Sequence, residues 1–240
     1  MNFKNRFILF IPLLALLFPS CKEEIIDYTP KEFIGENESR LRVVNTASFP
    51  GKLEYFINDQ KLTGDTIAYG SSFPISEFLR VPSGPMNFKA TAPALSSTVY
   101  TSALTFPAGK YNTLFLIDTL PNIDSYMVTD DQLIPPADSG KALIRLVHVS
   151  KGIGNLNMVN VTTTPGDTLS KNIPYKSHTA FMLVNAGSQR FQLYTSGTSV
   201  SIGSMFTTTL TPNRVYTFFA RGRSNGGSTY GPTLQVITTR

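Results

Sequence analysis

Cysteine and tryptophan are almost missing from this chain of 240 residues. Cys21 is the only cysteine and there is no tryptophan. A lone cysteine excludes an intramolecular disulfide, so hydrophobic cores alone must stabilise any folded domain. Charged side chains make up only 15% of the chain, and no segment after the first 20 residues repeats apolar side chains with a helical period. The many Thr, Ser, β-branched and aromatic residues, with 17 Gly and 16 Pro, instead indicate an all-β exported protein.

Histidine is also scarce, which limits the chemistry available for catalysis. His148 and His178 are the only two, whereas a zinc site takes three or four ligands from His, Cys and carboxylates. Asp130-Asp131 is interpreted as a solvated strand end, with weak calcium ligation as the alternative. The sequence lacks a Gly-x-Ser-x-Gly elbow, and the glycine-rich segment 222–228 lacks the Lys and Ser/Thr of a phosphate-binding loop. We therefore expect no metal, no cofactor and no catalytic activity; a Ser-His-Asp triad is the enzymatic alternative.

The positive charge of the chain is mild and scattered. Removing Lys4 and Arg6 with the first 20 residues leaves 19 of the 21 basic residues against 16 acidic ones, a net charge of +3. The basic residues do not gather into the stripe that is typical of nucleic-acid-binding proteins. We therefore expect no nucleic-acid partner. With 41% hydrophobic residues the chain can build packed cores, so it is not a disordered protein.

The first 21 residues have the layout of a lipoprotein leader. Lys4 and Arg6 form a positive start, and residues 7–18 form an apolar run shorter than the ~20 residues of a transmembrane helix. The sequence LFPSC at residues 17–21 then resembles a lipobox, where signal peptidase II cuts before a cysteine that carries lipid. We expect Cys21 to be the lipid attachment site of an exported bacterial lipoprotein. A cleaved secretory signal with an incidental cysteine is the alternative.

Three charged residues, Lys22, Glu23 and Glu24, follow the cysteine directly. They resemble the export signal that sends lipoproteins to the outer face of the outer membrane in some Gram-negative bacteria. The alternative is a charged start to a linker, and residues 21–39 as a whole are interpreted as a tether. We therefore predict a protein that is lipid-anchored in the cell outer membrane and exposed at the surface.

Short β-prone segments separated by turn residues follow the tether. About eight strands are expected within residues 40–131, as in a β-sandwich, with a hairpin turn at residues 58–61. Residues 111–118 form a long, mainly apolar segment, as expected for a buried central strand. Residues 132–141, which contain two adjacent prolines, are interpreted as a semi-rigid linker.

The same pattern then starts again and fills residues 142–240. Matching residues of the two halves are separated by a near-constant offset of 103–106 positions, which indicates a duplication. We predict two tandem immunoglobulin-like β-sandwich domains, at residues 40–131 and 142–240. The matching pairs include Arg42 and Arg145, Tyr69 and Tyr175, and Phe88 and Phe191.

The first copy contains the motifs LRVV at 41–44, IAYGS at 67–71, VPSG at 81–84 and PAGKY at 107–111. On these motifs, residues 40–240 resemble the bacterial domain-of-unknown-function family 4397, which often occurs as tandem copies in exported proteins. In the second copy, Lys176 and Asn213 replace glycines of the first copy. The resemblance implies immunoglobulin-like sandwiches and brings no catalytic residues.

Two tyrosines that recur in both copies leave two interpretations open. Tyr69 and Tyr175 lie next to turns. Aromatic rings stack on sugar faces, so both are candidate ligand-binding residues. Tyrosines at strand positions more often fill sandwich cores and seal their ends, and recurrence through duplication favours this structural role.

These features together favour a non-catalytic, lipid-anchored cell-envelope protein that acts as a surface display, adhesion or assembly module. Its partners would be the membrane, through the N-terminal lipid, and envelope proteins or glycans. The alternative is a glycan-binding accessory lipoprotein of a polysaccharide uptake system, which would present exposed tyrosines beside a shallow groove.

Overall fold

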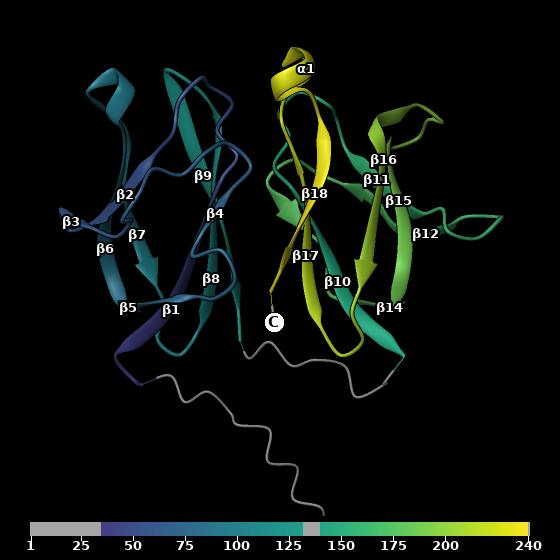
Figure 1. Ribbon diagram of the computed structural model, residues 1–240, viewed down its shortest axis with the longest axis horizontal. Coiled ribbons are helices and arrows are strands. Elements are labelled where there is room, and N and C mark those ends of the chain that lie inside the picture. The colour runs from purple at the N-terminus through teal and green to yellow at the C-terminus, as the bar shows by residue number, and fades with distance from the viewer. Residues whose placement is uncertain (1–34, 132–139, 240) are drawn as a thin grey trace, which may run out of the picture. The chain divides into compact units, whose positions relative to one another are not determined.

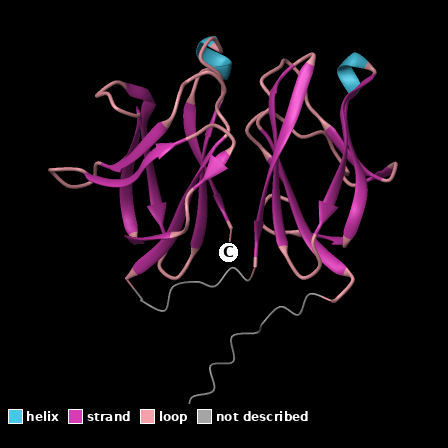
Figure 2. Cartoon of the chain, turned by 180° about the vertical axis from the view of Figure 1, so that it is seen from behind, coloured by secondary structure: helices cyan, strands magenta, loops and turns pink. Residues whose placement is uncertain are grey.

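A computed structural model describes residues 35–131 and 140–239. Regular structure in these ranges is almost entirely strand, with one short 3₁₀ helix and one short α-helix (Figure 2). These residues belong to one compact unit that spans residues 34–240. The leader with Cys21, and residues 132–139 of the predicted linker, lie outside the described residues.

The first sandwich is built from nine strands within residues 38–130. They are β1 (Glu38–Asn45), β2 (Glu54–Ile57), β3 (Gln60–Lys61), β4 (Ser72–Phe73), β5 (Leu79–Pro82), β6 (Gly84–Ala92), β7 (Ser97–Phe106), β8 (Tyr111–Thr119) and β9 (Asn122–Asp130), with the 3₁₀ helix η1 (Pro93–Leu95) before β7. One sheet has the order β4-β1-β8-β9, with β5 also pairing with β1; the other has the order β3-β2-β6-β7 (Figure 1). β1 and β8 are parallel neighbours.

The second sandwich repeats this topology with nine strands within residues 141–238. They are β10 (Lys141–His148), β11 (Leu156–Asn160), β12 (Asp167–Ile173), β13 (Ser177–His178), β14 (Met182–Asn185), β15 (Gly187–Thr195), β16 (Ser201–Leu210), β17 (Val215–Arg221) and β18 (Thr233–Thr238), with helix α1 (Gly227–Tyr230) before β18. Its sheets have the orders β13-β10-β17-β18, with β14 on β10, and β12-β11-β15-β16. The prediction of two tandem immunoglobulin-like sandwiches is therefore confirmed.

Three local details differ from the expectations. The hairpin turn is tighter than residues 58–61, because only Asn58 and Asp59 form the loop, with φ of 47° and 64°, as a type I′ turn requires. Gln60 and Lys61 already form β3. β1 begins inside the predicted tether and β10 at the last residue of the predicted linker, because both strands extend to pair with β5 and β14.

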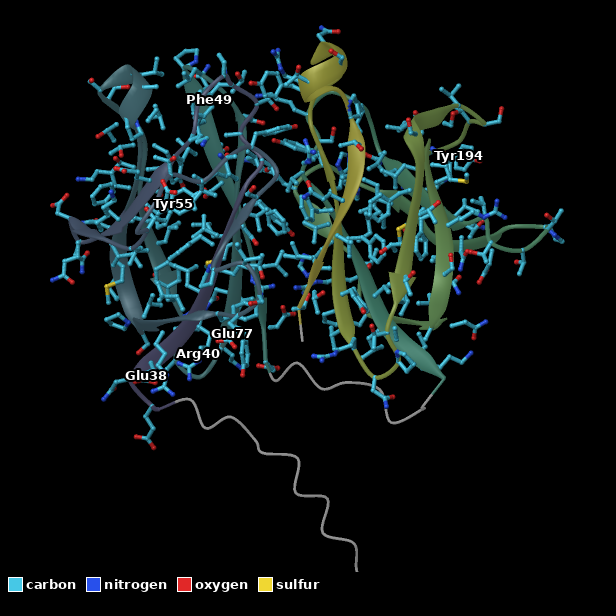
Figure 3. All side chains as sticks on the ribbon, in the orientation of Figure 1. Glu38, Arg40, Phe49, Tyr55, Glu77 and Tyr194 are labelled. Atoms are coloured by element: carbon cyan, nitrogen blue, oxygen red, sulfur yellow. The ribbon has the colours of Figure 1, made fainter. Side chains whose placement is uncertain are left out.

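Each sandwich has its own hydrophobic core between its two sheets. In the first, Leu114 clusters with Tyr55 and Phe88, and Tyr55 lies in the interior (Figure 3). Tyr55 is completely buried, and this burial raises the pKa of its hydroxyl. In the second, Phe191 and Phe218 pack with their ring centroids 4.8 Å apart. A tyrosine at a strand position thus fills the core here, as such residues commonly do.

The central strands β8 and β17 are buried on both faces. Residues 111–117 of β8 are all buried, although only alternate side chains of a strand can face its own core. On the other face of β8, Phe115 and Ile117 join a third cluster that includes residues of both sandwiches. We call this cluster the inter-sandwich interface; it consists of Val44, Phe115, Ile117 and Val128 with Val147, Val149, Phe219 and Ile237.

The inter-sandwich interface explains why residues 111–118 are mainly apolar. The second sheet of the first sandwich covers one face of β8, and the second sandwich covers the other face. An antiparallel sandwich with one solvated face would show strict alternation of apolar and polar residues instead. The prediction of a buried central strand is therefore confirmed, and the tertiary structure supplies its cause.

Truncating one aromatic ring of the inter-sandwich interface tests this packing. Phe115 and Phe219 pack with centroids 5.5 Å apart. Phe219→Ala should lower the free energy of unfolding by about 3–5 kcal/mol, because it removes a fully buried aromatic side chain. Urea unfolding followed by fluorescence or circular dichroism measures the change.

Ile75→Ala is the control, since Ile75 is 82% exposed and its loss should change stability by no more than about 0.5 kcal/mol. Combining Phe219→Ala with Phe115→Ala should give less than the sum of the two effects, because both remove the same contact. Full additivity, or a loss below about 1 kcal/mol for Phe219→Ala, would contradict the packed interface.

Candidate functional site

The inter-sandwich interface joins the same face of both sandwiches. Phe115 faces Val44 across the β1/β8 pair, and Phe219 faces Val147 across the β10/β17 pair, so the two rings hold equivalent positions. They contact each other directly. When equivalent residues meet, the two partners are related by an approximate two-fold rotation, as in an isologous dimer. The duplicated sandwiches thus associate like the subunits of a homodimer.

Two buried arginines reach across this interface in opposite directions. Arg42 Nη1 donates a hydrogen bond to the Thr238 carbonyl oxygen of β18, at 2.7 Å. Arg145 Nη1 donates to Asp130 Oδ1 of β9, at 2.6 Å. Burial lowers the pKa of Arg42 to about 10, so its guanidinium stays charged at neutral pH. Each arginine therefore ties the middle of its own sheet to the last strand of the other sandwich.

An aromatic ring supports each of these guanidinium groups. The ring centroid of Phe78 lies 4.4 Å from the guanidinium carbon of Arg42. The ring centroid of Phe181 lies 4.6 Å from the guanidinium carbon of Arg145. Cation–π contact offsets part of the loss of hydration that burial imposes on a charge. Both sandwiches contain this pair of a buried arginine and a phenylalanine ring, so both copies have retained the pair after the duplication.

The interpretation of Asp130-Asp131 as a solvated strand end is wrong for one of the two residues. Asp131 is 81% exposed and pairs with Lys110 at the surface. Asp130 has only 14% of its side chain exposed and pairs with the fully buried Arg145. Its carboxylate is thus part of the inter-sandwich interface, because β9 brings it beside a charge of the second sandwich.

Tyr69, a predicted ligand-binding residue, also lies at the boundary of the two sandwiches. Its ring is perpendicular to the ring of Tyr230, with centroids 5.0 Å apart. The guanidinium carbon of Arg221 lies 4.3 Å from its centroid. Within the described residues the buried Tyr69 hydroxyl has no hydrogen-bond partner. Tyr69 therefore packs on residues of the second sandwich.

Tyr175, the equivalent residue of the second sandwich, contacts the first sandwich in return. Its hydroxyl donates a hydrogen bond to Asp118 Oδ1, and its ring lies 5.8 Å from that of His148. Burial, followed by the hydrogen bond and charge of Asp118, raises the pKa of Tyr175. Both predicted tyrosines are half-buried and have separate partners across the interface; ligand binding by either stays a prediction.

Contacts between the two sandwiches explain why Gly70 of the first copy corresponds to Lys176 in the second. Gly70 has φ of 80°, and a Cβ there would come within 3.0 Å of Gln235 Oε1 and 3.3 Å of the Arg221 guanidinium. Lys176 keeps the left-handed conformation, with φ of 55°, although a non-glycine residue is strained there. Its Nζ atom forms an ion pair with Asp124 of the first sandwich. The lysine therefore adds a side-chain ion pair at a position where Gly70 contacts the second sandwich only through its backbone carbonyl.

The two histidines lie on the paired strands β10 and β13 with their side chains on opposite faces, and each has its own structural partners. His148 Nε2 donates to the Gly154 carbonyl at 2.8 Å, and its Nδ1 accepts from the Ser150 amide at 3.3 Å. Burial lowers the pKa of His148, and a proton on Nδ1 would also face the Ser150 N–H. His178 Nδ1 lies 2.7 Å from the Tyr126 hydroxyl of the first sandwich. Burial, and then the Arg145 charge, lower the pKa of His178.

The described residues form neither a metal-binding cluster nor a membrane-spanning helix. Residues 35–131 and 140–239 contain no group of three or more His, Cys, Asp or Glu side chains that could hold a metal ion. No helix in these ranges is long and apolar enough to cross a membrane. Cys21 and residues 22–24, the predicted lipid site and export signal, lie outside them.

A pocket of about 210 Å³ opens on the second sandwich alone, away from the inter-sandwich interface residues. Strands β10, β11, β12, β14 and β15 and the loop after β11 supply its walls. Its lining includes the charged side chains of Lys141 and Asp167, the amides of Asn160 and Gln189, and the exposed Leu183. The residues that line it include no aromatic side chain.

The sequence pattern pairs Arg42 with Arg145 but predicts no role for them, and it predicts no site at the pocket, although the duplication carries a signal for both. Arg42 and Arg145 are charged residues at matching places inside apolar strands. At the offset of 103 residues, Asn160 stands where the first copy has Ile57. A polar residue in one copy at a position that is apolar in the other indicates that the position has different roles in the two sandwiches.

The fold and the interface define an all-β protein of two tandem immunoglobulin-like sandwiches. The chain belongs to the family described as domain of unknown function (DUF4397), whose sequence model matches residues 39–159. The match extends from β1 to β11, so it covers the first sandwich and the first strands of the second.

Two further comparisons add no functional argument. A solved structure similar to this chain is the carbohydrate-binding module CBMbc, of family CBM26, from Eubacterium rectale Amy13K in complex with maltoheptaose. It is 11% identical, the match covers 84% of this chain and 97% of the module, and the TM-score is 0.27. So low a score supports no transfer of function. No curated protein matches the chain.

Removing the partner of a buried charge tests the ion pair between Arg145 and Asp130. Asp130→Ala should destabilise the protein by about 3–5 kcal/mol, because it leaves the Arg145 guanidinium buried and unpaired. Asp131→Ala is a matched control one residue away, since exposed pairs contribute only about 0–1 kcal/mol. Chemical denaturation measures both variants, and equal effects would show that Asp130 is solvated after all.

The lowered pKa of His148 predicts a pH dependence of stability. Below the ordinary histidine pKa of 6.5 and down to the lowered pKa of the folded state, the unfolded protein binds more protons at this residue. The stabilisation is therefore complete above pH 6.5 and is lost as the pH falls below it. Wild-type protein should therefore be less stable at pH 5.5 than at pH 7.5. Thermal unfolding at both pH values measures the difference.

His148→Asn is the matched variant, because the first copy has Asn45 at this position. It should reduce the loss of stability on acidification. Its Tm difference between the two pH values should be smaller than that of the wild type. An unchanged difference would show that His148 does not titrate with unfolding.

Proposed function

We propose that this protein is a non-catalytic, lipid-anchored cell-envelope protein whose two sandwiches act as one rigid display, adhesion or assembly module. The observation that carries the proposal is the inter-sandwich interface, which buries eight apolar residues. Domains that are joined by a linker alone move relative to each other by default. A packed apolar interface removes that freedom and turns two modules into one block.

Polar contacts at the edges of the interface support the same role. Lys151 Nζ lies 2.7 Å from Asp118 Oδ2 and links the two sandwiches. Burial tends to raise the pKa of Asp124, but its hydrogen bond with Lys176 and the charges of Lys176 and Lys151 outweigh this effect and lower it. On the other side, Gln235 Nε2 donates to the Gly70 carbonyl at 2.7 Å. These bonds set one geometry, as a spacer that holds a binding surface away from a membrane requires.

The N-terminal sequence supports the anchored part of the proposal. Cys21 follows an apolar run of signal-peptide length and precedes Lys22, Glu23 and Glu24. Two or more acyl chains hold a protein stably on a membrane, where a single chain does not. The protein would then stand on the cell outer membrane, at its outer face, with envelope proteins or glycans as its partners.

Replacing the acylated residue tests the anchor. In cells fed with an alkyne fatty acid, the wild-type protein should take up the label, and Cys21→Ala should lose it completely. The same variant should disappear from the mature membrane-bound fraction, because no thiol remains to carry the lipid. Gel fluorescence after click coupling and cell fractionation measure the two effects.

The triple change of Lys22, Glu23 and Glu24 to Ala is the control. It leaves Cys21 in place, so the label should stay, while digestion of the protein by protease added to intact cells should decrease. Labelling of Cys21→Ala at the wild-type level would overturn the lipid anchor. Equal protease digestion of the triple variant and the wild type would overturn the export signal.

A further inference from the structure

The pocket on the second sandwich has a polar wall at positions that are apolar in the first sandwich. Asn160 pairs with Phe191 across β11 and β15, exactly where Ile57 pairs with Phe88 across β2 and β6. Ile57 is a core residue, only 6% exposed. The second copy has therefore exchanged a core residue for an amide that lines a pocket.

A second exchange accompanies the first on the neighbouring strand. Gln189 of β15 stands where the first sandwich has Met86, which packs against the first core. Gln189 is only 6% exposed, and its Oε1 accepts hydrogen bonds from Asn160 Nδ2 at 2.8 Å and from the Thr162 hydroxyl at 3.1 Å. Buried amides are retained only when they are hydrogen-bonded, so the two changes depend on each other.

This small network positions the loop that forms one side of the pocket. The Thr162 amide donates to Asn160 Oδ1 at 2.9 Å, and the Thr162 hydroxyl accepts from the Arg190 amide at 2.8 Å. The loop after β11 is thereby tied to β15 at two points. Preorganised polar groups bind a ligand with less loss of conformational entropy than groups on a free loop.

The pocket chemistry fits a small neutral ligand with several hydroxyl groups. Lys141 and Asp167 bring opposite charges, so the lining favours neither a net anion nor a net cation. Lys141 Nζ donates to Asn185 Oδ1 at 2.6 Å and keeps further N–H donors. The Asn160 amide keeps one N–H donor and one acceptor site on Oδ1 beyond its bonds with Gln189 and Thr162, and a ligand hydroxyl needs such a pair. Leu183 adds an apolar patch for the C–H groups of a sugar ring.

The size of the pocket limits the ligand to one ring. Pockets for drug-sized ligands occupy roughly 300–1,000 Å³, whereas this one measures about 210 Å³. That volume holds about seven water molecules at ~30 Å³ each. We propose that this pocket of the second sandwich binds a single neutral sugar unit, either free or at the end of a glycan chain.

Titration of the isolated compact unit with single sugars tests the site. Residues 34–240 contain both cores and the whole pocket. D-Glucose, D-galactose, D-mannose and N-acetyl-D-glucosamine are each added to about 20 mM, because contacts with one small ring support only millimolar affinity. In ¹H–¹⁵N NMR spectra, at least one sugar should shift the amide signals of residues 160–169 and 183–190 in a saturable way.

Reciprocal exchanges between the two sandwiches provide the variant and its control. Leu183 is 58% exposed at the pocket and is equivalent to the exposed Arg80 of the first sandwich. Leu183→Arg places a long charged side chain at the pocket and should weaken binding at least tenfold without changing the core signals. Arg80→Leu makes the opposite change away from the pocket and should leave the affinity unchanged.

Three results would overturn the proposal. The first is that none of the four sugars shifts the pocket signals. The second is that Leu183→Arg binds a sugar as well as the wild type does. The third is that glucuronate or glycine, added as charged comparison ligands, shifts the pocket signals while the neutral sugars do not. Cys21 is absent from residues 34–240, so none of these results bears on the lipid anchor.

Discussion

The contact between Phe115 and Phe219 reflects the constraint on which the rest of the structure depends: both faces of β8 and β17 must be buried. The strands that carry these rings, β8 and β17, have apolar side chains on both faces. A sandwich covers one face of each strand with its own second sheet and leaves the other apolar face exposed to water. Only another apolar surface can cover that face, and the duplicated copy has a matching one. The interface therefore follows from burial on both sides of two central strands.

Two buried charges then determine the relative arrangement of the two sandwiches, which the apolar contact alone does not specify. Hydrophobic packing is non-directional, so a cluster of Val, Ile and Phe side chains by itself allows neighbouring arrangements to compete. Arg42 and Arg145 are almost fully buried, and each has its hydrogen-bond acceptor on the last strand of the other sandwich. A shift of either sandwich would leave a guanidinium buried without its acceptor, which is strongly destabilising. The arginines thus select one arrangement among those that the apolar faces permit.

The two copies have diverged both at the interface and away from it. At the interface, Gly70 and Lys176 differ, yet both serve contacts with the opposite sandwich. Away from it, Ile57 in the first copy fills a core, while Asn160 in the second joins a polar network beside a pocket. One sandwich keeps a closed core at this position and the other opens a cavity. The fold tolerates this difference because residues 57 and 160 lie outside the inter-sandwich interface that holds the two sandwiches together.

The sequence by itself determined the fold class, the duplication and the burial of residues 111–117, because strand periodicity and a constant offset are local signals. It also placed Tyr69 and Tyr175 at equivalent sites. Only the tertiary structure decided what covers the second face of β8, since a period of two residues says that a face is buried but not by what. The same holds for Asp130, which looks like a solvated strand end until Arg145, from the other sandwich, lies against it. A polar Gln189 is unremarkable in a strand sequence; its meaning comes from the network and the pocket that folding places around it.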